Sequence, residues 1–327
     1  MRQWGRLVLA WVFFCASQGV FSQEQPWDRW VAEVRKEALA QGISPAVFDD
    51  AFRGIHEPSR QIKGLARSQP EHRLSYSKYL HSRVDKYRIV VGRQQYKKNK
   101  AMLDEIAAHF GVDPCFIMAF WGMETSYGSY MGDFPVIKSL ATLAYDSKRR
   151  DFFRNELFLA LHILNDGHVT LSRFKGEWAG ASGHPQFLPS SWVKYAVDYD
   201  GDGRKDIWDS KPDAFASIAN YMKKNGWKTG EPWAIYVKLP AHFDPTLQGK
   251  SIVKSVREWN ALGVRTVSGA MLPHEDWQAS VVQPNGGPVF LAYPNYKMIL
   301  RYNNSIYYAG AIGYLADQIC QRAQVSE

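Results

Sequence analysis

The stretch that decides the fold of this protein is Asp113-Pro-Cys-Phe-Ile-Met-Ala-Phe-Trp-Gly-Met-Glu124-Thr-Ser-Tyr-Gly128. Asp113 is a suitable N-cap, Pro114 suits the first helical position and Gly128 suits the C-terminal stop, so the stretch predicts a helix. This helix is apolar on nearly every side, which is typical of a helix at the centre of a fold.

Glu124 is the one carboxylate inside this apolar helix. It lies near the negative end of the helix dipole and among aromatic and methionine side chains, and both influences raise the pKa of a carboxyl group. A general acid needs such an environment to keep its proton near neutral pH. The alternative is a structural glutamate paired with an arginine such as Arg149 or Arg150.

The N-terminus predicts export. Two arginines precede the apolar run Leu7–Ala16, and the small residues Val20 and Ser22 follow it, as in a signal peptide cleaved after Ser22. Cys15 in the run offers a lipid anchor as the alternative, but the bulky residue before it disfavours lipoprotein processing. We therefore expect a periplasmic protein with no transmembrane segment once the signal is removed.

Charge and cysteine usage are consistent with an exported protein. The formal net charge is +8, and removal of residues 1–22, with two arginines and no acid, leaves +6. A basic exported protein favours an anionic polymer such as the cell wall, although this charge also serves solubility. Nucleic acid is excluded as a partner by export. Cys115 and Cys320 remain, and their distance in sequence does not establish whether they pair.

The pattern along the chain predicts an α+β fold that is predominantly helical. The predicted helices and strands fall in a helical first part, a small β-rich insertion and a C-terminal helix. The helices are Trp27–Gln41, Ser44–Arg53, Glu71–Lys100 and Ser305–Ala323, besides helical hairpins between residues 101 and 227, and the strands are Trp233–Leu239, Gly287–Ala292 and Lys297–Tyr302.

A second motif, Gly176–Trp192, contains closely spaced glycines and one amide. Gly180 and Gly183 let the backbone turn tightly and leave room for a ligand against the main chain. Gln186 offers a neutral donor and acceptor that suits sugar hydroxyl and acetamido groups. The alternative is a tight turn that precedes a capped helix.

A third motif, Asp198–Asp209, has the spacing of an EF-hand loop. Acids occupy loop positions 1, 3, 5, 9 and 12, glycine occupies position 6 and position 7 offers its carbonyl. The predicted Ca²⁺ ligands are Asp198, Asp200, Asp202, Arg204, Asp206 and Asp209. The aspartate at position 12 replaces the usual glutamate, and the alternative is an acidic surface loop. We expect a structural ion and no organic cofactor.

Together these motifs resemble the lytic murein transglycosylase B family. The resemblance rests on Glu124–Gly128, Gly180–Ser191, Asp198–Asp209 and Arg301–Asn303, in this order. It implies a lysozyme-like core with an N-terminal helical region and a small β-rich insertion. The expected division is a signal peptide at 1–22, a helical region at 23–100, a catalytic core at 101–227, a β-rich region at 228–300 and a C-terminal helix at 301–327.

The resemblance also implies functional residues. Glu124 takes the position of the catalytic acid/base, and five residues take positions that line the groove for N-acetylated sugars. These are Gln186, Tyr221, Tyr302, Asn303 and Tyr308. Glu177 departs from the family, which commonly has serine there. This second carboxylate either shares a proton with Glu124 or points to solvent.

The implied reaction is the non-hydrolytic cleavage of peptidoglycan glycan strands between N-acetylmuramic acid and N-acetylglucosamine. It leaves 1,6-anhydro-N-acetylmuramic acid ends. A hydrolytic muramidase is the alternative enzyme and needs a second acid, such as Glu177, Asp133 or Asp146. A non-catalytic wall-binding protein stabilised by calcium is the alternative from another class.

Overall fold

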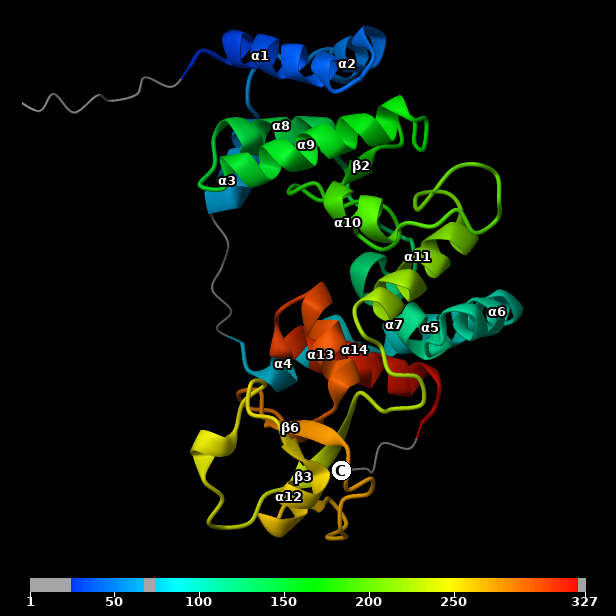
Figure 1. Ribbon diagram of the computed structural model, residues 1–327, viewed down its shortest axis with the longest axis vertical. Helices are drawn as coiled ribbons and strands as arrows, with labels where there is room; N and C mark the ends of the chain where they lie inside the picture. The colour runs from blue at the N-terminus through cyan, green and yellow to red at the C-terminus, as the bar shows by residue number, and fades with distance from the viewer. Residues whose placement is uncertain (1–24, 68–73, 323–327) are drawn as a thin grey trace, which may run out of the picture.

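The computed structural model describes residues 25–67 and 74–322, which form mostly helices (Figure 1). The predicted α+β class is confirmed, and the predicted signal peptide lies outside the described residues. In chain order the elements are α1 Trp27–Ala40, α2 Pro45–Ala51, α3 Arg60–Arg67, α4 Tyr76–Arg83, α5 Lys86–Lys98, α6 Lys100–Phe110, α7 Pro114–Thr125, β1 Phe134–Pro135, α8 Val136–Tyr145, α9 Arg150–Asn165, β2 Lys175–Gly176, α10 Pro189–Tyr195, α11 Lys211–Lys224, β3 Ala234–Lys238, η1 Pro245–Leu247, β4 Lys254–Ser255, α12 Val256–Ala261, β5 Arg265–Thr266, β6 Gln278–Val282, β7 Phe290–Ala292, α13 Pro294–Tyr302 and α14 Ile306–Ile319.

Helix α7 is the centre of the main core, as its sequence predicts. Asp113 caps it, with Oδ1 accepting a hydrogen bond from the backbone N of Cys115 at 2.9 Å. Nine of its twelve residues are buried, and it packs against α5, α6, α11 and α14. Because so many helices surround it, the helix has no polar face.

The C-terminal end of α7 is conformationally strained. The helix ends at Thr125, and the next three residues, Ser126, Tyr127 and Gly128, have φ angles of 49°, 61° and 78°. Glycine adopts this left-handed conformation at little cost, whereas serine and tyrosine do so only when their surroundings hold them. Arg88 supplies that support: its guanidinium donates to Ser126 Oγ at 2.8 Å and its carbonyl accepts from Tyr127 Oη at 2.9 Å.

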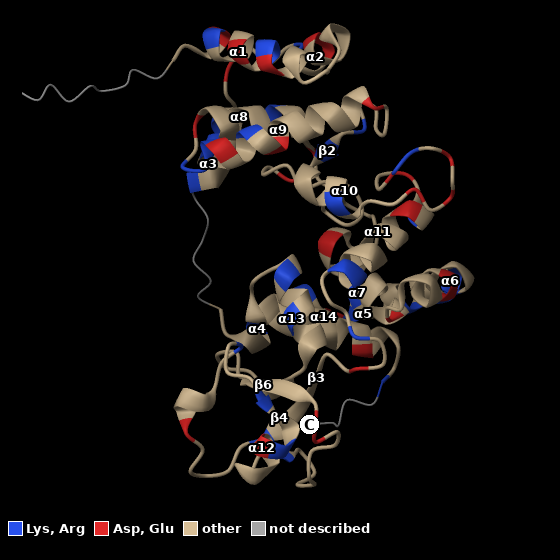
Figure 2. Cartoon of the chain, viewed as in Figure 1, with Lys and Arg blue, Asp and Glu red and all other residues tan. Residues whose placement is uncertain are grey.

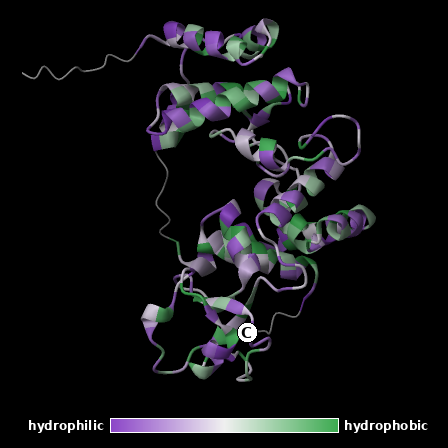
Figure 3. Cartoon of the chain, in the orientation of Figure 1, coloured by the Kyte–Doolittle hydropathy of each residue, from purple (hydrophilic) through white to green (hydrophobic). Residues whose placement is uncertain are grey.

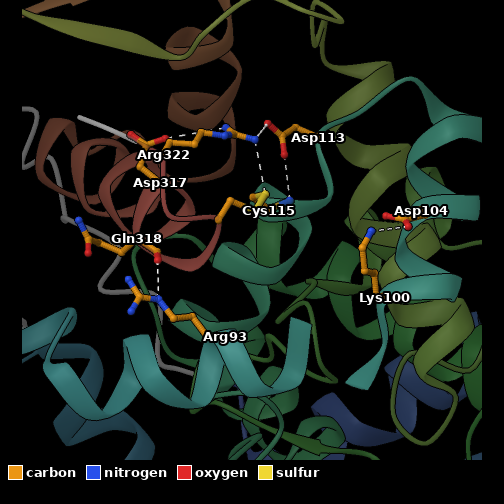
Figure 4. Close-up of a disulfide and its surroundings, with 9 residues drawn as sticks. Arg93, Lys100, Asp104, Asp113, Cys115, Asp317, Gln318 and Arg322 are labelled. Carbon is orange, nitrogen blue, oxygen red and sulfur yellow. Dashed lines mark hydrogen bonds and ion pairs between the residues drawn. A yellow bond between two sulfur atoms is a disulfide. The ribbon is translucent and has the colours of Figure 1, made fainter. Parts of the chain in front are cut away.

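A disulfide joins the start of α7 to the end of α14 (Figure 4). The Cα atoms of Cys115 and Cys320 are 6.1 Å apart, so the pairing that the sequence leaves open is present. Beside it, Arg322 forms an ion pair with Asp113. The two helices therefore run antiparallel, and their other ends meet at Glu124.

Helices α1, α2, α3, α8, α9 and α10 stack on one side of this centre (Figure 1). Helices α8 and α9 form a hairpin, α2 packs on α9, and α3 packs on α8. Figure 3 shows hydrophobic and hydrophilic residues side by side on α8 and α9, as expected of helices with one buried face. The short antiparallel sheet of β1 and β2 joins the segment before α8 to the Gly176 loop.

The β-rich region has its own small core on the opposite side (Figure 1). Its antiparallel sheet has the strand order β4-β6-β7-β3-β5. Trp259, Val256, Val281, Leu291 and Tyr293 are buried in this core. Helix α4 packs on α14.

Two predicted elements are wrong. Residues 297–302 belong to α13, which begins at Pro294 and buries Tyr296, Met298 and Ile299; a short apolar pattern did not distinguish this helix from a strand. The predicted long helix Glu71–Lys100, whose first three residues lie outside the described residues, is broken in its described part, because α4 ends at Arg83 and Asp85 caps α5 through Arg88 N at 2.7 Å. The predicted domain boundaries stay a prediction.

Within residues 25–67 and 74–322, no single helix combines the length and hydrophobicity needed to cross a bilayer. Helices α6 and α7 reach that length only as a pair bent by 112°. Most of α7 is buried in the protein core.

Candidate active site

Glu124 lies in the last turn of α7, where the buried helix reaches a cavity. Its side chain is partly exposed, whereas the preceding turn of the helix is almost entirely buried. Burial raises the pKa of Glu124 to about 7, and the charge of Glu177 adds to the increase, while a hydrogen bond from Tyr308 and the charge of Arg83 oppose it. Near neutral pH the carboxyl group therefore populates both protonation states, as a group that alternates between acid and base requires.

Tyr308 holds the carboxyl group of Glu124 in place. Its hydroxyl donates a hydrogen bond to Glu124 Oε1 from the first turn of α14. Ser305 caps this helix, with Oγ accepting from Tyr308 N at 3.3 Å. Burial, followed by the charge of Glu124, raises the pKa of Tyr308 well above 10.0, so the phenol keeps its proton and remains a donor.

The cavity beside Glu124 has a volume of about 720 Å³ and lies between α4, the end of α7 and the segment that enters α14. Ten residues line it: Tyr79, Arg83, Met123, Glu124, Asn303, Asn304, Ser305, Ile306, Tyr307 and Tyr308. Of these, Glu124 is the single acid and Arg83 the single cation. Hydroxyl, amide and aromatic groups make up most of the rest, which suits the hydroxyl-bearing and apolar faces of a sugar.

The structure brings three of the predicted residues, Glu124, Asn303 and Tyr308, to this cavity. Two others lie behind it in an aromatic cluster. The ring of Tyr302 lies 4.7 Å from that of Tyr221, and its hydroxyl donates to the carbonyl of Pro185. Tyr302 thereby connects α13 to the loop that carries Gln186.

Gln186 is held by its own loop. Its Nε2 donates to the carbonyls of Met131 at 3.1 Å and Gly183 at 3.0 Å, and its backbone has a φ of 50°. Its Oε1 is buried without a hydrogen-bond partner among the described residues. Gly183 has a φ of 70°, and an added Cβ there would approach Ile207 Cγ1 within 2.7 Å. The predicted tight turn is therefore present, and among the described residues the buried amide oxygen of Gln186 accepts no hydrogen bond.

None of the three candidate second acids lines the cavity. Glu177 is partly exposed in the turn before Gly180, and its charge acts on Glu124 without a direct hydrogen bond between them among the described residues. Asp146, at the end of α8, forms an ion pair with Lys63. Asp133 lies near Tyr130. Desolvation is the largest cause that raises the pKa of Tyr130, and the charge of Asp133 adds to it. The cavity therefore offers one carboxyl group.

The acid-rich loop between α10 and α11 stands out in red at the edge of the molecule (Figure 2). Oxygen atoms of Asp198, Asp200 and Asp202 lie within 4.8 Å of one another. The two carboxylate oxygens of Asp198 accept from Gly201 N at 2.8 Å and Gly203 N at 2.9 Å, which fixes the sharp turn. Three converging carboxylates are donors of the kind that Ca²⁺ prefers.

The other predicted ligands have different partners. Asp206 is buried, and its Oδ1 accepts from the backbone N of Trp208 at 3.0 Å and of Asp209 at 2.8 Å. Asp209 forms an ion pair with Arg173. The guanidinium of Arg204 donates to Asp202 at 2.8 Å. The loop thus presents three of the predicted ligands together, with the carbonyl of residue 204 following in the chain, and these oxygen donors fit a calcium ion.

Sequence reasoning missed several residues near the two sites. Tyr79 and Arg83 reach the cavity from α4, whose sequence carries no signal that places it beside Glu124. Asp213, the third residue of α11, accepts hydrogen bonds from the backbone N of Tyr199 and Asp206 at 2.7 and 2.8 Å and so anchors the acidic loop. These contacts depend on the tertiary arrangement of elements that are distant in sequence.

The chain matches a known protein family and a curated relative. Residues 26–317 match the family of the transglycosylase SLT domain. The chain is 35% identical over 214 residues to the membrane-bound lytic murein transglycosylase B of Escherichia coli, an alignment that covers 64% of this chain and 58% of that relative. The chain therefore spans little more than half the length of this curated relative.

Solved structures resemble the chain more completely. SltB3 from Pseudomonas aeruginosa, crystallised with NAG-anhNAM-pentapeptide, superposes with a TM-score of 0.88 at 44% identity and covers 90% of this chain and 80% of its own. A second SltB3 crystal holds NAG-NAM-pentapeptide and superposes equally well. The Escherichia coli lytic transglycosylase SLT35 in complex with calcium gives a TM-score of 0.77 at 26% identity, with 94% of this chain and 96% of its own covered.

Proposed function

This chain belongs to the transglycosylase SLT-domain family, and we propose that it is a lytic transglycosylase acting on peptidoglycan glycan strands. The observation that carries the proposal is the cavity with one carboxyl group, Glu124, whose pKa is raised to about 7 by burial. Hydrolytic glycosidases mostly place two carboxyl groups beside the bond that they cleave. A site with one such group favours a reaction in which the substrate supplies its own nucleophile.

In the proposed reaction, Glu124 first acts as the acid. Its proton passes to the β-1,4 glycosidic oxygen between N-acetylmuramic acid and N-acetylglucosamine, and the bond from that oxygen to C1 of the muramoyl sugar breaks. The N-acetyl group of the same sugar stabilises the positive charge that develops at C1. Glu124, now ionised, takes the proton of the 6-hydroxyl, whose oxygen bonds to C1. The product carries a 1,6-anhydro ring, no water is consumed, and the proton is back on Glu124.

The neighbouring side chains have supporting roles in this proposal. The hydrogen bond from Tyr308 orients the Glu124 carboxyl group toward the cavity. Asn303 lines the cavity and offers an amide to the sugars. Tyr302 and Tyr221 pack against each other next to these residues, and Gln186 holds its loop in shape through hydrogen bonds from Nε2 to the carbonyls of Met131 and Gly183.

Mass spectrometry of fragments released from purified peptidoglycan tests the proposal. The protein is compared with its Glu124→Gln variant, which keeps the side-chain shape but holds no transferable proton. Fragments that end in 1,6-anhydro-N-acetylmuramic acid, lighter than hydrolysis products by one water and absent with the variant, are expected. Anhydro fragments released at an undiminished rate by the variant would remove Glu124 from the reaction.

The hydrolytic alternative has one observation in its favour, the charge of Glu177 that acts on Glu124. Reducing-end products that disappear in the Glu177→Gln variant would establish it. A protein that binds peptidoglycan but releases no fragment would instead establish the non-catalytic alternative.

We also propose that the loop of Asp198, Asp200 and Asp202 binds Ca²⁺ as a structural ion. The calcium complex of SLT35 supports this assignment. The ion would hold the loop between α10 and α11 and would take no part in bond cleavage. At a free concentration a hundred times its Kd, a ligand bound only to the folded state adds about 2.7 kcal/mol of stability.

Thermal unfolding with and without a calcium chelator tests this site. We expect chelation to lower the Tm of the wild-type protein, and Asp198→Asn to abolish the response. A melting curve that chelation leaves unchanged would contradict a bound ion. Asp244→Asn, in a loop of the β-rich region, is the matched control for the loss of one acid.

The proposed site of action is the periplasm. It rests on the N-terminal sequence pattern and on the substrate class, and the Escherichia coli relative is named as membrane-bound. N-terminal sequencing and lipid labelling of the exported protein distinguish cleavage after Ser22 from a lipid anchor at Cys15.

A further inference from the structure

We propose that Arg83 is a specificity-determining residue that binds a carboxylate carried by the muramoyl sugar of the substrate, an inference that rests on the proposed function. Two carboxylates share this chemistry. One is the lactyl carboxylate of N-acetylmuramic acid that bears no peptide, and the other belongs to the peptide attached at the same position.

Arg83 has the position that such contact requires. It lies in the last turn of α4 and lines the same cavity as Glu124, although the two residues come from different helices. The positive charge of Arg83 lowers the pKa of Glu124, whereas burial raises it. A group bound by Arg83 is therefore close to the bond that Glu124 would protonate.

The surroundings of Arg83 leave its guanidinium available. The Cζ atom lies 5.9 Å from the ring centroid of Tyr79, which lines the cavity too, so an aromatic face supports the cation without consuming its donors. Among the described residues, no hydrogen bond or ion pair engages the guanidinium; only the backbone carbonyl of Arg83 is used, as an acceptor for Arg88. A cation that lines a cavity without a protein partner is suited to an anionic ligand.

Two other cations whose partners lie near the cavity are already engaged. Arg88 donates to Ser126 Oγ at 2.8 Å and to the Arg83 carbonyl. Lys250, from the β-rich region, donates to Asn304 Oδ1 at 2.5 Å. Arg83 is therefore the cation in this cavity whose donors can be given to a ligand.

The substrate class supplies the matching anion. Both SltB3 complexes hold a muramoyl sugar with a pentapeptide. A guanidinium offers two parallel donors to a carboxylate, a geometry that an ammonium group does not provide. Because every second sugar of the glycan strand is a muramoyl residue, one carboxylate contact would also set the register in which the strand enters the cavity.

A structural role is the competing explanation. A cation in the last turn of a helix stabilises that helix through its dipole, and Arg83 is such a cation in α4. This role predicts lower stability after substitution but no dependence on the charge of the substrate. The two explanations therefore differ in a measurable way.

The test compares wild-type protein with Arg83→Gln on three glycans of equal length: one with its peptides, one without peptides and with free lactyl carboxylates, and one with those carboxylates converted to neutral methylamides. The quantity measured is kcat/KM for anhydro product. Loss of the Arg83 charge also changes the pKa of Glu124. That change is the same with all three glycans, so it cancels when their kcat/KM values are compared as ratios. Lys78→Gln, also exposed on α4 but outside the cavity, is the matched control.

We expect Arg83→Gln to lose about tenfold more kcat/KM on a carboxylate-bearing glycan than on the neutral one, mainly through KM. A loss confined to the peptide-bearing glycan identifies the peptide carboxylate, and a loss confined to the peptide-free acid identifies the lactyl carboxylate. Arg83→Lys should recover only part of the difference.

An equal loss on all three glycans, or no loss on either charged glycan, would overturn the role of Arg83. Wild-type protein that forms no anhydro product from any of them would overturn the proposed function instead. Circular dichroism and the Tm of the variant check that the overall fold is retained in the sample used.

Discussion

The two ends of the α7–α14 pair differ in almost every physical respect. At one end, Cys115 and Cys320 form a covalent bridge beside a salt bridge, and the chain is well capped. At the other end, Glu124 is desolvated, a single tyrosine hydroxyl holds it, and Ser126 and Tyr127 have strained backbone angles. The same two helices thus combine an end that favours stability with an end that favours chemistry.

The largest expected effect is on turnover. Glu124→Gln should lower kcat by at least about 10³-fold, because a general acid and base contributes on that scale. Its Tm should not fall, since the substitution removes a group whose charge is unfavourable in its buried position. Product formation and thermal unfolding of the same sample provide the measurement. A variant with lowered Tm would mean that this end of the pair is stabilising as well.

The opposite result is expected at the disulfide end. Replacement of Cys115 and Cys320 by alanine should cost about 2–4 kcal/mol of unfolding free energy, as loss of a bridge that closes a long loop does. At 25 °C the folded fraction should keep its kcat, because the bridge and the cavity lie at different ends of the helices. Chemical denaturation and product assays test this. A large loss of kcat in folded protein would show that the two ends are coupled.

Tyr308→Phe tests how the reactive end is held. The hydrogen bond from Tyr308 lowers the pKa of Glu124, so its loss should raise that pKa further above about 7. Because the reaction begins with protonated Glu124, the fall of activity at high pH should move to higher pH. We expect kcat to drop by about tenfold at the same time, since one positioning hydrogen bond is lost. The pH profile of kcat/KM measures the shift; a profile that does not move would place the control of this pKa elsewhere.

The smallest effect concerns the dependence of stability on pH. Glu124 has a pKa of about 7 in the folded protein against an ordinary value of 4.5, so it destabilises the fold increasingly as pH rises between these two values. His184 packs on the ring of Trp121, and burial lowers its pKa to about 4 from 6.5, so its contribution to stability is lost as pH falls through that range. Between pH 4.5 and 6.5 the two effects oppose each other.

The Glu124→Gln variant lacks the opposing effect of Glu124, so the effect of His184 on stability should become measurable. In this variant the unfolding free energy should rise with pH between about 4.5 and 6.5 more steeply than in the wild type. Denaturant titrations at several pH values measure the two slopes. Parallel slopes would contradict the desolvation of Glu124 in the folded state. The expected difference is on the order of 2 kcal/mol over this range.

Much of this molecule could be predicted from local patterns. The apolar run, with its aspartate cap and proline, predicts α7 because capping and burial act within a few residues. The acidic loop follows from spacing alone, since Gly201 and Gly203 permit the turn that gathers Asp198, Asp200 and Asp202. The wrong predictions, the strand at 297–302 and the unbroken helix at 71–100, arose where short apolar patterns do not distinguish helix from strand or reveal an internal cap.

The sequence by itself determined the family, the fold class, the carboxyl group in the central helix and the donor set of the loop, because each depends on residues that are close together in the chain. Only the tertiary structure decided that Cys115 meets Cys320, that Tyr308 donates to Glu124, and that Arg83 lines the same cavity as Glu124. These contacts join α4, α7 and α14, which lie far apart in sequence. Packing of whole helices around the core sets such distances, and no local pattern encodes them.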